Sequence, residues 1–157
     1  MITDTSRAGL DRLMQEAQRL PTTGARALAP FTNQGKVYLA IAQLAVDVPD
    51  QPTRMTGGDH AVDTVIFRWQ DGRFVEHQRL PVPGGEDVET FTIGTRRFLA
   101  TASLRSGSGP YSMAVDSVLF EFVDGHFSTF QRFDTFEPNS GSTSASVSGN
   151  SSRSRKA

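Results

Sequence analysis

The chain has 157 residues and a formal net charge of −1, with 37% hydrophobic and 21% charged residues. This length fits one ordinary domain, and the near-zero charge argues against nucleic acid as a partner. Because cysteine is absent, disulfide bonds, thiolate metal sites and cysteine nucleophiles are all excluded.

Residues 1–30 are predicted to hold a short amphipathic helix followed by a linker. Apolar side chains recur at helical spacing over residues 6–20, and Pro21 ends that pattern. Residues 21–30 form the linker, which begins and ends with a proline.

The N-terminal segment is also charged throughout and lacks the apolar core of a signal peptide. No stretch of the chain approaches the ~20 apolar residues that a helix needs to span a bilayer. The sequence therefore predicts no membrane insertion, shows no visible route to secretion and leaves the compartment open.

Residues 31–80 are predicted to form one repeat and residues 86–133 a second. Each contains an apolar strand, a loop and a hairpin, in that order, with a period of 53 to 60 residues. The matching segments are 38–42 (YLAIA) and 98–102 (FLATA), then 64–80 (TVIFRWQDGRFVEHQRL) and 117–133 (SVLFEFVDGHFSTFQRF). A period of this size is typical of stacked units such as propeller blades.

The second repeat is predicted to contain four strands and the first to lack part of its leading strand. In the second repeat the strands are expected at about 87–93, 97–103, 116–123 and 126–133. In the first repeat they are expected at about 36–43, 62–70 and 73–80. The leading strand is reduced to residues 29–32, because Pro30 cannot donate to a ladder.

Both hairpins carry the same predicted turn. Asp71-Gly72 and Asp124-Gly125 each lie between alternating aromatic residues. A two-residue type I′ turn requires positive φ at both central residues, and Asp followed by Gly tolerates that conformation well. The turns therefore fix the register of each hairpin.

The strands of the hairpins are apolar on both faces. In the second repeat one face carries Val118, Phe120 and Phe122. The opposite face carries Leu119 and Val123. An antiparallel sheet with one wet face would alternate between apolar and polar residues. These sheets are therefore expected to be sandwiched between others, as blades are in a radial stack.

Residues 138–157 are rich in serine and contain one aliphatic side chain larger than alanine. Such a segment cannot bury enough apolar surface to offset the entropy lost on ordering. A disordered C-terminal tail is therefore predicted.

The order of motifs resembles the EAR repeat, also called the EPTP or epitempin repeat. The resemblance rests on DVETF at 87–91, FLATA at 98–102, and a hairpin with Asp124-Gly125, Phe127 and Gln131. It covers about residues 31–133, or two units. In that family seven units close a β-propeller that binds proteins outside the cell. The resemblance implies an all-β fold of two consecutive antiparallel propeller-type blades, a partial propeller.

Two blades would leave two outer faces uncovered, each with several large apolar side chains. Soluble monomers rarely expose apolar patches above a few hundred Å². We therefore expect a fragment of a larger propeller or a subunit that completes one, with another protein or further blades as the partner.

The sequence contains no Ser-His-Asp arrangement with an anchored order and no phosphate-binding loop. Together with the duplicated repeats and the family resemblance, which implies a protein-binding surface, this favours a protein–protein interaction module rather than an enzyme. Loops supply binding residues in propellers, and Tyr and Arg are frequent at interface hot spots. Within the loop 104–115 we accordingly expect Arg105 and Tyr111 to contact a partner.

An alternative is a metal-dependent binder or enzyme that uses the loop with Asp59, His60 and Asp63. Carboxylates and imidazole at this spacing could serve a metal or acid–base site, although no third anchored ligand is evident. No cofactor is otherwise predicted. The family resemblance implies that Asp87 could face a propeller channel, where carboxylates could bind Ca²⁺.

Overall fold

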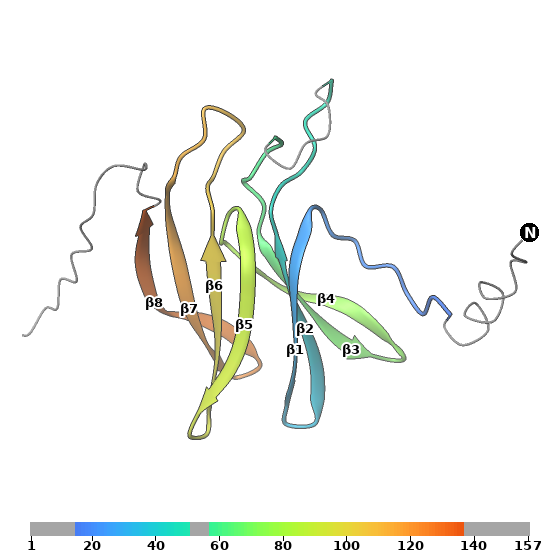
Figure 1. The fold of residues 1–157 in the computed structure, drawn as a ribbon. Helices are drawn as coiled ribbons and strands as arrows, with labels where there is room; N and C mark the ends of the chain where they lie inside the picture. The colour runs from blue at the N-terminus through green and yellow to red at the C-terminus, as the bar shows by residue number, and fades with distance from the viewer. Residues whose placement is uncertain (1–14, 51–56, 137–157) are drawn as a thin grey trace, which may run out of the picture.

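The computed structural model describes residues 15–50 and 57–136, which form two four-stranded antiparallel sheets (Figure 1). The predicted tail at 138–157 and the first part of the predicted helix lie outside these residues. The strands are β1 (Ala25–Asn33), β2 (Lys36–Gln43), β3 (Thr64–Gln70), β4 (Arg73–Leu80), β5 (Gly85–Ile93), β6 (Arg96–Ser103), β7 (Ala114–Val123) and β8 (His126–Phe136).

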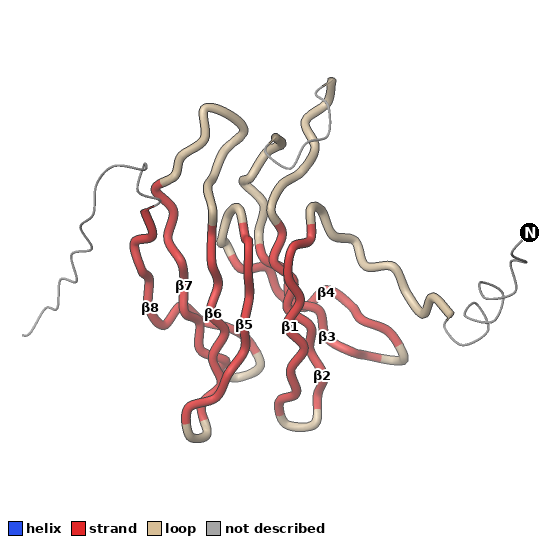
Figure 2. Tube along the Cα trace, viewed as in Figure 1, coloured by secondary structure: helices blue, strands red, loops and turns tan. Residues whose placement is uncertain are grey.

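Each sheet is a meander in which neighbours in sequence are also neighbours in space. The first sheet has the order β1-β2-β3-β4 and the second the order β5-β6-β7-β8. Figure 2 shows strands and loops throughout the described chain, which confirms the all-β prediction. No helix in these residues has the length and apolarity to cross a membrane.

The predicted hairpin turns are confirmed. Asp71 and Gly72 have φ angles of 51° and 80°, and Asp124 and Gly125 have φ angles of 50° and 86°. Positive φ at both central positions is the requirement of a type I′ turn. Beyond the turns, the register of β3–β4 shifts between Ile66 and Phe67, and that of β7–β8 shifts at the equivalent place. The two sheets therefore repeat each other even in their irregularities.

The leading strand of the first sheet is longer than predicted. β1 pairs with β2 from Ala25 to Asn33, and Pro30 lies opposite Leu39 within this ladder. β1 has a hydrogen-bonded neighbour on one side only. An edge strand tolerates proline, because half of its backbone groups point away from the sheet. The expected strand at 29–32 was therefore too short.

The prediction of an N-terminal helix is wrong for its described part, because residues 15–20 contain no helix. The Gln18 side chain instead bonds to the backbone of β4, donating from Nε2 to Phe74 O and accepting from Phe74 N, both at 2.8 Å. Leu20 packs against an apolar cluster on the first sheet. These tertiary contacts hold the segment against β4 in place of helical hydrogen bonds.

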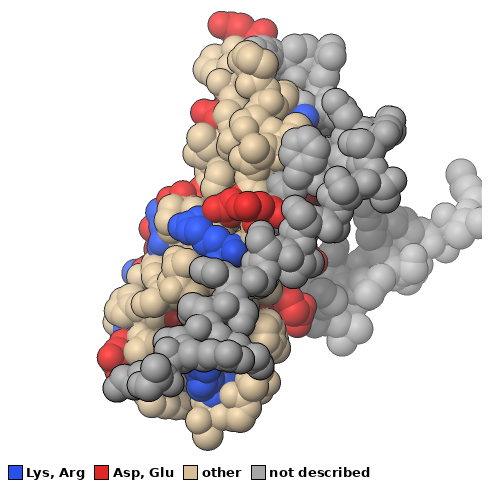
Figure 3. All heavy atoms as spheres, turned by 90° about the vertical axis from the view of Figure 1, so that its left-hand side faces the viewer, with Lys and Arg blue, Asp and Glu red and all other residues tan. Residues whose placement is uncertain are grey.

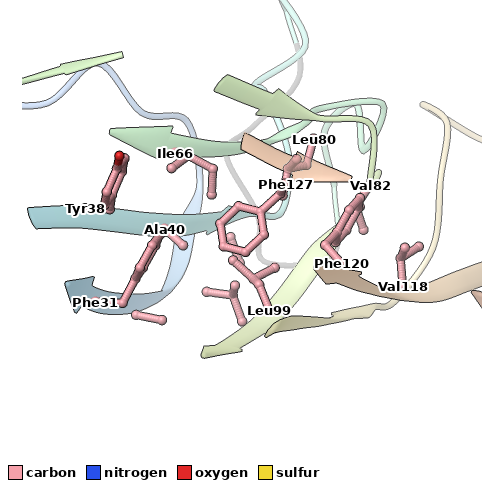
Figure 4. Packing of buried hydrophobic residues seen from close by; sticks show 13 residues of the cluster. Phe31, Tyr38, Ala40, Ile66, Leu80, Val82, Leu99, Val118, Phe120 and Phe127 are labelled. Atoms are coloured by element: carbon pink, nitrogen blue, oxygen red, sulfur yellow. The ribbon is translucent and has the colours of Figure 1, made fainter. Parts of the chain in front are cut away.

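The main core lies between the two sheets, which stack face to face (Figure 4). The first sheet contributes Tyr38, Ala40 and Ile66, and the second contributes Leu99 and Phe120. Ala40 is fully buried. Its small side chain lets the sheets approach closely, as interdigitated packing at crystal-like density requires.

The first sheet is apolar on its other face as well. A second cluster there contains Ile41, Val65 and Phe67, with Leu39 and Phe74 packed against it. The predicted apolar character of both faces is thus confirmed for this sheet. Two four-stranded sheets stacked in this way are consistent with consecutive propeller blades.

Candidate interaction surface

Two loops lie at the same end of the two sheets (Figure 1). One is residues 44–63, between β2 and β3, and the other is residues 104–113, between β6 and β7. We refer to their described parts as the paired rim. The loops are joined directly, because His60 N donates a hydrogen bond of 2.9 Å to Gly107 O.

Each loop of the paired rim is also narrowed by its own backbone. Val46 and Asp59 exchange two N–H···O bonds of 2.8 Å. Ser106 and Ser112 exchange two similar bonds, of 2.9 and 3.0 Å. These reciprocal bonds hold the two sides of each loop together as a short antiparallel arm. They also satisfy backbone groups that would otherwise need water.

A glycine fixes where the second loop begins. Gly84 O accepts a hydrogen bond of 2.9 Å from Leu104 N. Gly84 has φ +60°, and a Cβ at this position would lie 1.9 Å from Arg105 O. Only glycine combines this φ with so close a backbone approach. The contact places Arg105 at the base of the rim.

The structure brings together the two side chains expected to contact a partner. The Arg105 guanidinium carbon lies 3.9 Å from the centre of the Tyr111 ring, within cation–π range. Tyr111 Oη donates a hydrogen bond of 3.1 Å to Gly58 O in the neighbouring loop. Both side chains are half-buried. They are therefore held in one arrangement by contacts that cross between the two loops.

His60 is the third member of this cluster. Arg105 Nε and Nη2 lie 3.2 and 3.1 Å from His60 Nε2. A guanidinium can only donate, so a hydrogen bond from Arg105 requires the tautomer of His60 that carries its proton on Nδ1. The same Nε2 also lies 3.2 Å from Gly57 O, which would accept from the other tautomer. The ring also packs edge-on against Tyr111, with centroids 5.1 Å apart.

The His60 ring is fully buried. Burial lowers its pKa, and the positive charge of Arg105 lowers it further. The contact with Gly57 O and the charges of Asp59 and Glu86 act in the opposite direction but are smaller. His60 is thus a neutral acceptor for Arg105 at neutral pH.

In the loop that was the alternative metal or acid–base site, Asp59, His60 and Asp63 make separate contacts. Asp59 Oδ1 accepts from Ala61 N at 2.9 Å, and His60 faces Arg105. The Asp63 carbonyl accepts from Gln43 Nε2 at 2.7 Å. Among the residues described, no three His, Asp or Glu side chains group in a way that could hold a metal ion.

Asp87 lies near the start of β5, where Oδ1 accepts a hydrogen bond of 2.8 Å from Val88 N. The adjacent Glu86 pairs with Arg26 of β1 at 2.9 Å. The equivalent position in the first sheet is Ala27, which has no ligand atom in its side chain. Ca²⁺ at Asp87 therefore stays a prediction that rests on the family resemblance.

A side-chain clamp between the two sheets was not predicted from the sequence. Gln78 of β4 donates from Nε2 to Phe127 O and accepts at Oε1 from Phe127 N, both at 2.8 Å. Next to it, His77 Nε2 lies 2.7 Å from Gly125 O, and the His77 ring stacks on His126. β8 is an edge strand, so the clamp satisfies outward-facing backbone groups of Phe127. The repetition of this glutamine as Gln131 was the available signal.

The contact between Gln18 and Phe74 repeats this clamp on the outer side of the first sheet. Residues 16–21 read EAQRLP and residues 76–81 read EHQRLP. Both segments contain an Arg–Glu pair three residues apart, at 2.9 and 2.6 Å. We name residues 15–21 the leading strap. It is the sequence equivalent of the second half of β4, placed before the first sheet.

Charge is evenly mixed over the side of the molecule nearest β8. Figure 3 shows small blue and red patches next to each other within a largely uncharged surface. Arg96 and Glu121 of the second sheet form an ion pair, with 2.6 Å between Nε and Oε1. No continuous basic field, which a nucleic-acid partner would favour, is visible on this view.

Comparison with known proteins gives a family match to the EPTP domain. The match comprises residues 15–70 and residues 73–123, together more than half of the chain. Each matched unit begins with the segment that carries a clamp glutamine. This segment is the leading strap in the first unit and β4 in the second. The matched units and the sheets are thus offset by one strand.

Two curated relatives have the name thrombospondin-type laminin G domain and EAR repeat-containing protein. The mouse and human proteins are each 31% identical to this chain over 115 residues. The alignments cover 72% of this chain and 15% of each relative. The chain therefore spans a small part of the length of these relatives.

The lowered pKa of His60 predicts a pH dependence of stability. The unfolded chain takes up this proton near the ordinary pKa of ~6.5, and the folded chain takes it up only at lower pH. The contribution of the neutral His60 to the free energy of unfolding is therefore complete above pH ~6.5. We expect that free energy to decrease as the pH falls below this value. Urea unfolding at about pH 7.5 and pH 5.5 measures the difference.

The comparison variant is His60→Gln, which keeps an acceptor for Arg105 without titrating. It should show a smaller loss of stability on acidification than the natural chain, while all other titrating groups contribute equally to both. An identical loss in the two proteins would contradict the assignment.

The clamp predicts a large difference between two equivalent glutamines. Gln78→Ala leaves the N–H and C=O of Phe127 without their partner and should lower the free energy of unfolding by about 2 kcal/mol. Gln131→Ala changes an exposed side chain with no clamp partner among the described residues and should cost less than about 0.5 kcal/mol. Chemical denaturation of both variants checks this, and equal losses would count against the clamp.

Proposed function

Because this chain belongs to the EPTP domain family, we propose that it is a non-enzymatic protein-interaction module built from propeller-type blades. We further propose that the paired rim contacts a partner protein and that the two sheets work as part of a larger propeller. The observation that carries the proposal is the cross-bonded arrangement of Arg105, Tyr111 and His60 on stacked sheets.

The rim is suited to binding because its side chains are already ordered. Arg105 is held between His60 and the Tyr111 ring, and Tyr111 is held by Gly58 O. A partner that meets these groups does not have to immobilise them, and that ordering cost is about 0.5–1.5 kcal/mol for each flexible side chain. Tyr and Arg are also the residue types that dominate interface energetics.

The chemistry of the rim supports binding without turnover. His60, the one imidazole in the cluster, is buried and uses Nε2 to accept from Arg105. A general base must reach the proton that it removes from a substrate, and this nitrogen is directed at a guanidinium instead. The remaining contacts in the cluster are made by backbone carbonyls and an aromatic ring.

Membership of a larger propeller is supported by the outer surface of the second sheet. Exposed aromatic and aliphatic side chains of β5 and β8 lie there, namely Phe91, Ile93, Phe130 and Phe133. The named relatives are longer proteins that contain EAR repeats, and this chain aligns with 15% of their length. The partner would then be another protein or further blades.

A photo-crosslinking residue at Ser108 tests the rim as a partner site. Ser108 is exposed within the loop 104–113. We expect a crosslinker there to capture a specific protein, whereas a crosslinker at the exposed Lys36, in the β1–β2 hairpin, should not capture it. The captured protein is then purified and its affinity for the natural chain is measured by calorimetry.

Tyr111→Ala and Arg105→Ala should each weaken that binding by about tenfold or more, as expected for hot-spot residues. Lys36→Ala is the matched control and should leave the affinity unchanged. Unchanged binding by both rim variants, with circular dichroism showing intact sheets, would remove the rim from the interface.

A further inference from the structure

The junction between the two sheets buries one face of each sheet. The other face of each sheet points outward and is equivalent, by the sequence repeat, to one of the two buried faces. We define the trailing face as the surface of the second sheet that faces away from the first. Its residues correspond by repeat to those of the first sheet that fill the junction. The equivalent pairs are Phe31 and Phe91, Tyr38 and Phe98, His77 and Phe130, Gln78 and Gln131, and Leu80 and Phe133.

Burial separates the members of these pairs except Tyr38 and Phe98, which are both 2% exposed. Within the junction, Phe31 and Leu80 are 6% and 1% exposed. On the trailing face, Phe91, Phe130 and Phe133 are 36%, 49% and 45% exposed. The trailing face therefore has the composition of a buried junction without a sheet against it among the described residues.

Two of the charges on the trailing face are already paired with each other. Arg96 and Glu121 form a pair with 2.6 Å between Nε and Oε1, and the Arg96 guanidinium lies over the rings of Phe98 and Phe130. Removal of this surface from water would bury Arg96 and Glu121 as a pair. A pair with its hydrogen bonds made is the form in which buried charges are tolerated. Glu89, which is exposed at the position equivalent to the buried Ala29, is the charge that docking would have to accommodate.

The complementary surface is the outer face of the first sheet, which we name the leading face. Its Leu28 and Trp69 are 61% and 46% exposed. At the equivalent positions in the second sheet, which the junction covers, Val88 is 3% exposed and Phe122 is half-buried. The leading face is thus built to receive a sheet and is only partly covered.

The leading strap covers part of the leading face. Gln18 occupies the backbone groups of Phe74 as Gln78 occupies those of Phe127, with the same distance of 2.8 Å. The side chains from residue 15 to Arg19 are exposed, and only Leu20 is half-buried. The strap therefore supplies the clamp without the apolar surface that a complete sheet would bring.

From these surfaces we infer that two copies of this chain associate head to tail, with the trailing face of one copy on the leading face of the next. Gln131 of one copy takes the place of Gln18 at Phe74 of the other copy, and the strap is displaced. The inference deepens the proposed function, on which it rests, because it names a second copy as the source of the next blades. The contact is heterologous, so each copy retains one unused face and longer assemblies can form.

The leading strap competes with this association. The same two backbone groups of Phe74 bond either to Gln18 of the same chain or to Gln131 of a neighbour. The intramolecular competitor has the advantage of high effective concentration, and the neighbour has the advantage of larger apolar contact. Removal of the Gln18 side chain should therefore shift the balance toward association.

Sedimentation velocity and native mass spectrometry over a wide concentration series test the inference on the full chain. The natural chain is expected to show a monomer in equilibrium with dimers and longer species. Gln18→Ala should strengthen association by about tenfold, since it frees the acceptor site on each copy. A chain that stays monomeric in both forms overturns the inference.

Two charge variants then test the faces. Phe130→Arg blocks the trailing face, and Trp69→Arg blocks the leading face, so each variant alone should stay monomeric. Their mixture retains one productive pair of faces and should yield 1:1 dimers but no longer species. The matched control is Val46→Arg, which places the same charge at an exposed apolar residue of the paired rim and should associate like the natural chain.

Association of either blocked variant with itself overturns the head-to-tail arrangement, and so does failure of the mixture to form dimers. Binding of the trailing face to a different EAR repeat protein and never to a second copy also overturns it. These results are separable from the proposed function. A strictly monomeric chain that still binds a protein through Arg105 and Tyr111 would keep the rim module and lose only the self-association.

Discussion

Each sheet of this protein carries large apolar side chains on both faces, so each sheet requires a packed neighbour on both sides. The junction between the two sheets meets that requirement once. Alanines in β2 allow close approach, aromatic rings of both sheets interlock, and a glutamine clamp joins β4 to the edge strand β8. Burial of apolar surface supplies the driving force, and the clamp fixes the register without adding a charge.

The proposed interaction surface follows from the same stacking. Because the sheets stack, the loops 44–63 and 104–113 emerge side by side, and Arg105 can reach His60 and Tyr111 at once. The glycine at residue 84 fixes the start of the second loop by a backbone contact that no other residue permits. Rim and junction are therefore parts of one arrangement, in which rigid sheets position short loops.

Much of the architecture was predictable from sequence, because it is encoded locally. The Asp-Gly turns and the doubly apolar strands predicted the hairpins and the stacked sheets. The leading strap was mistaken for a helix, because its apolar spacing fits a helical period and the bonding of Gln18 to Phe74 depends on a contact distant in sequence. β1 was predicted too short, because edge position, which makes Pro30 tolerable, is not visible in the strand itself. Arg105 and Tyr111 were chosen by residue type, whereas the role of His60 required the approach of two loops.

The most direct test of the stacked arrangement is a measurement of ring-to-ring contacts across the junction by nuclear Overhauser spectroscopy. The account predicts cross-peaks between Tyr38 and Phe122 and between Phe31 and Phe127, whose centroids lie 5.2 and 5.5 Å apart. These pairs join the first sheet to the second, so neither sheet alone produces them. Intact β-sheet signals without these cross-peaks would contradict the stacking from which the rim and the outer faces have been derived.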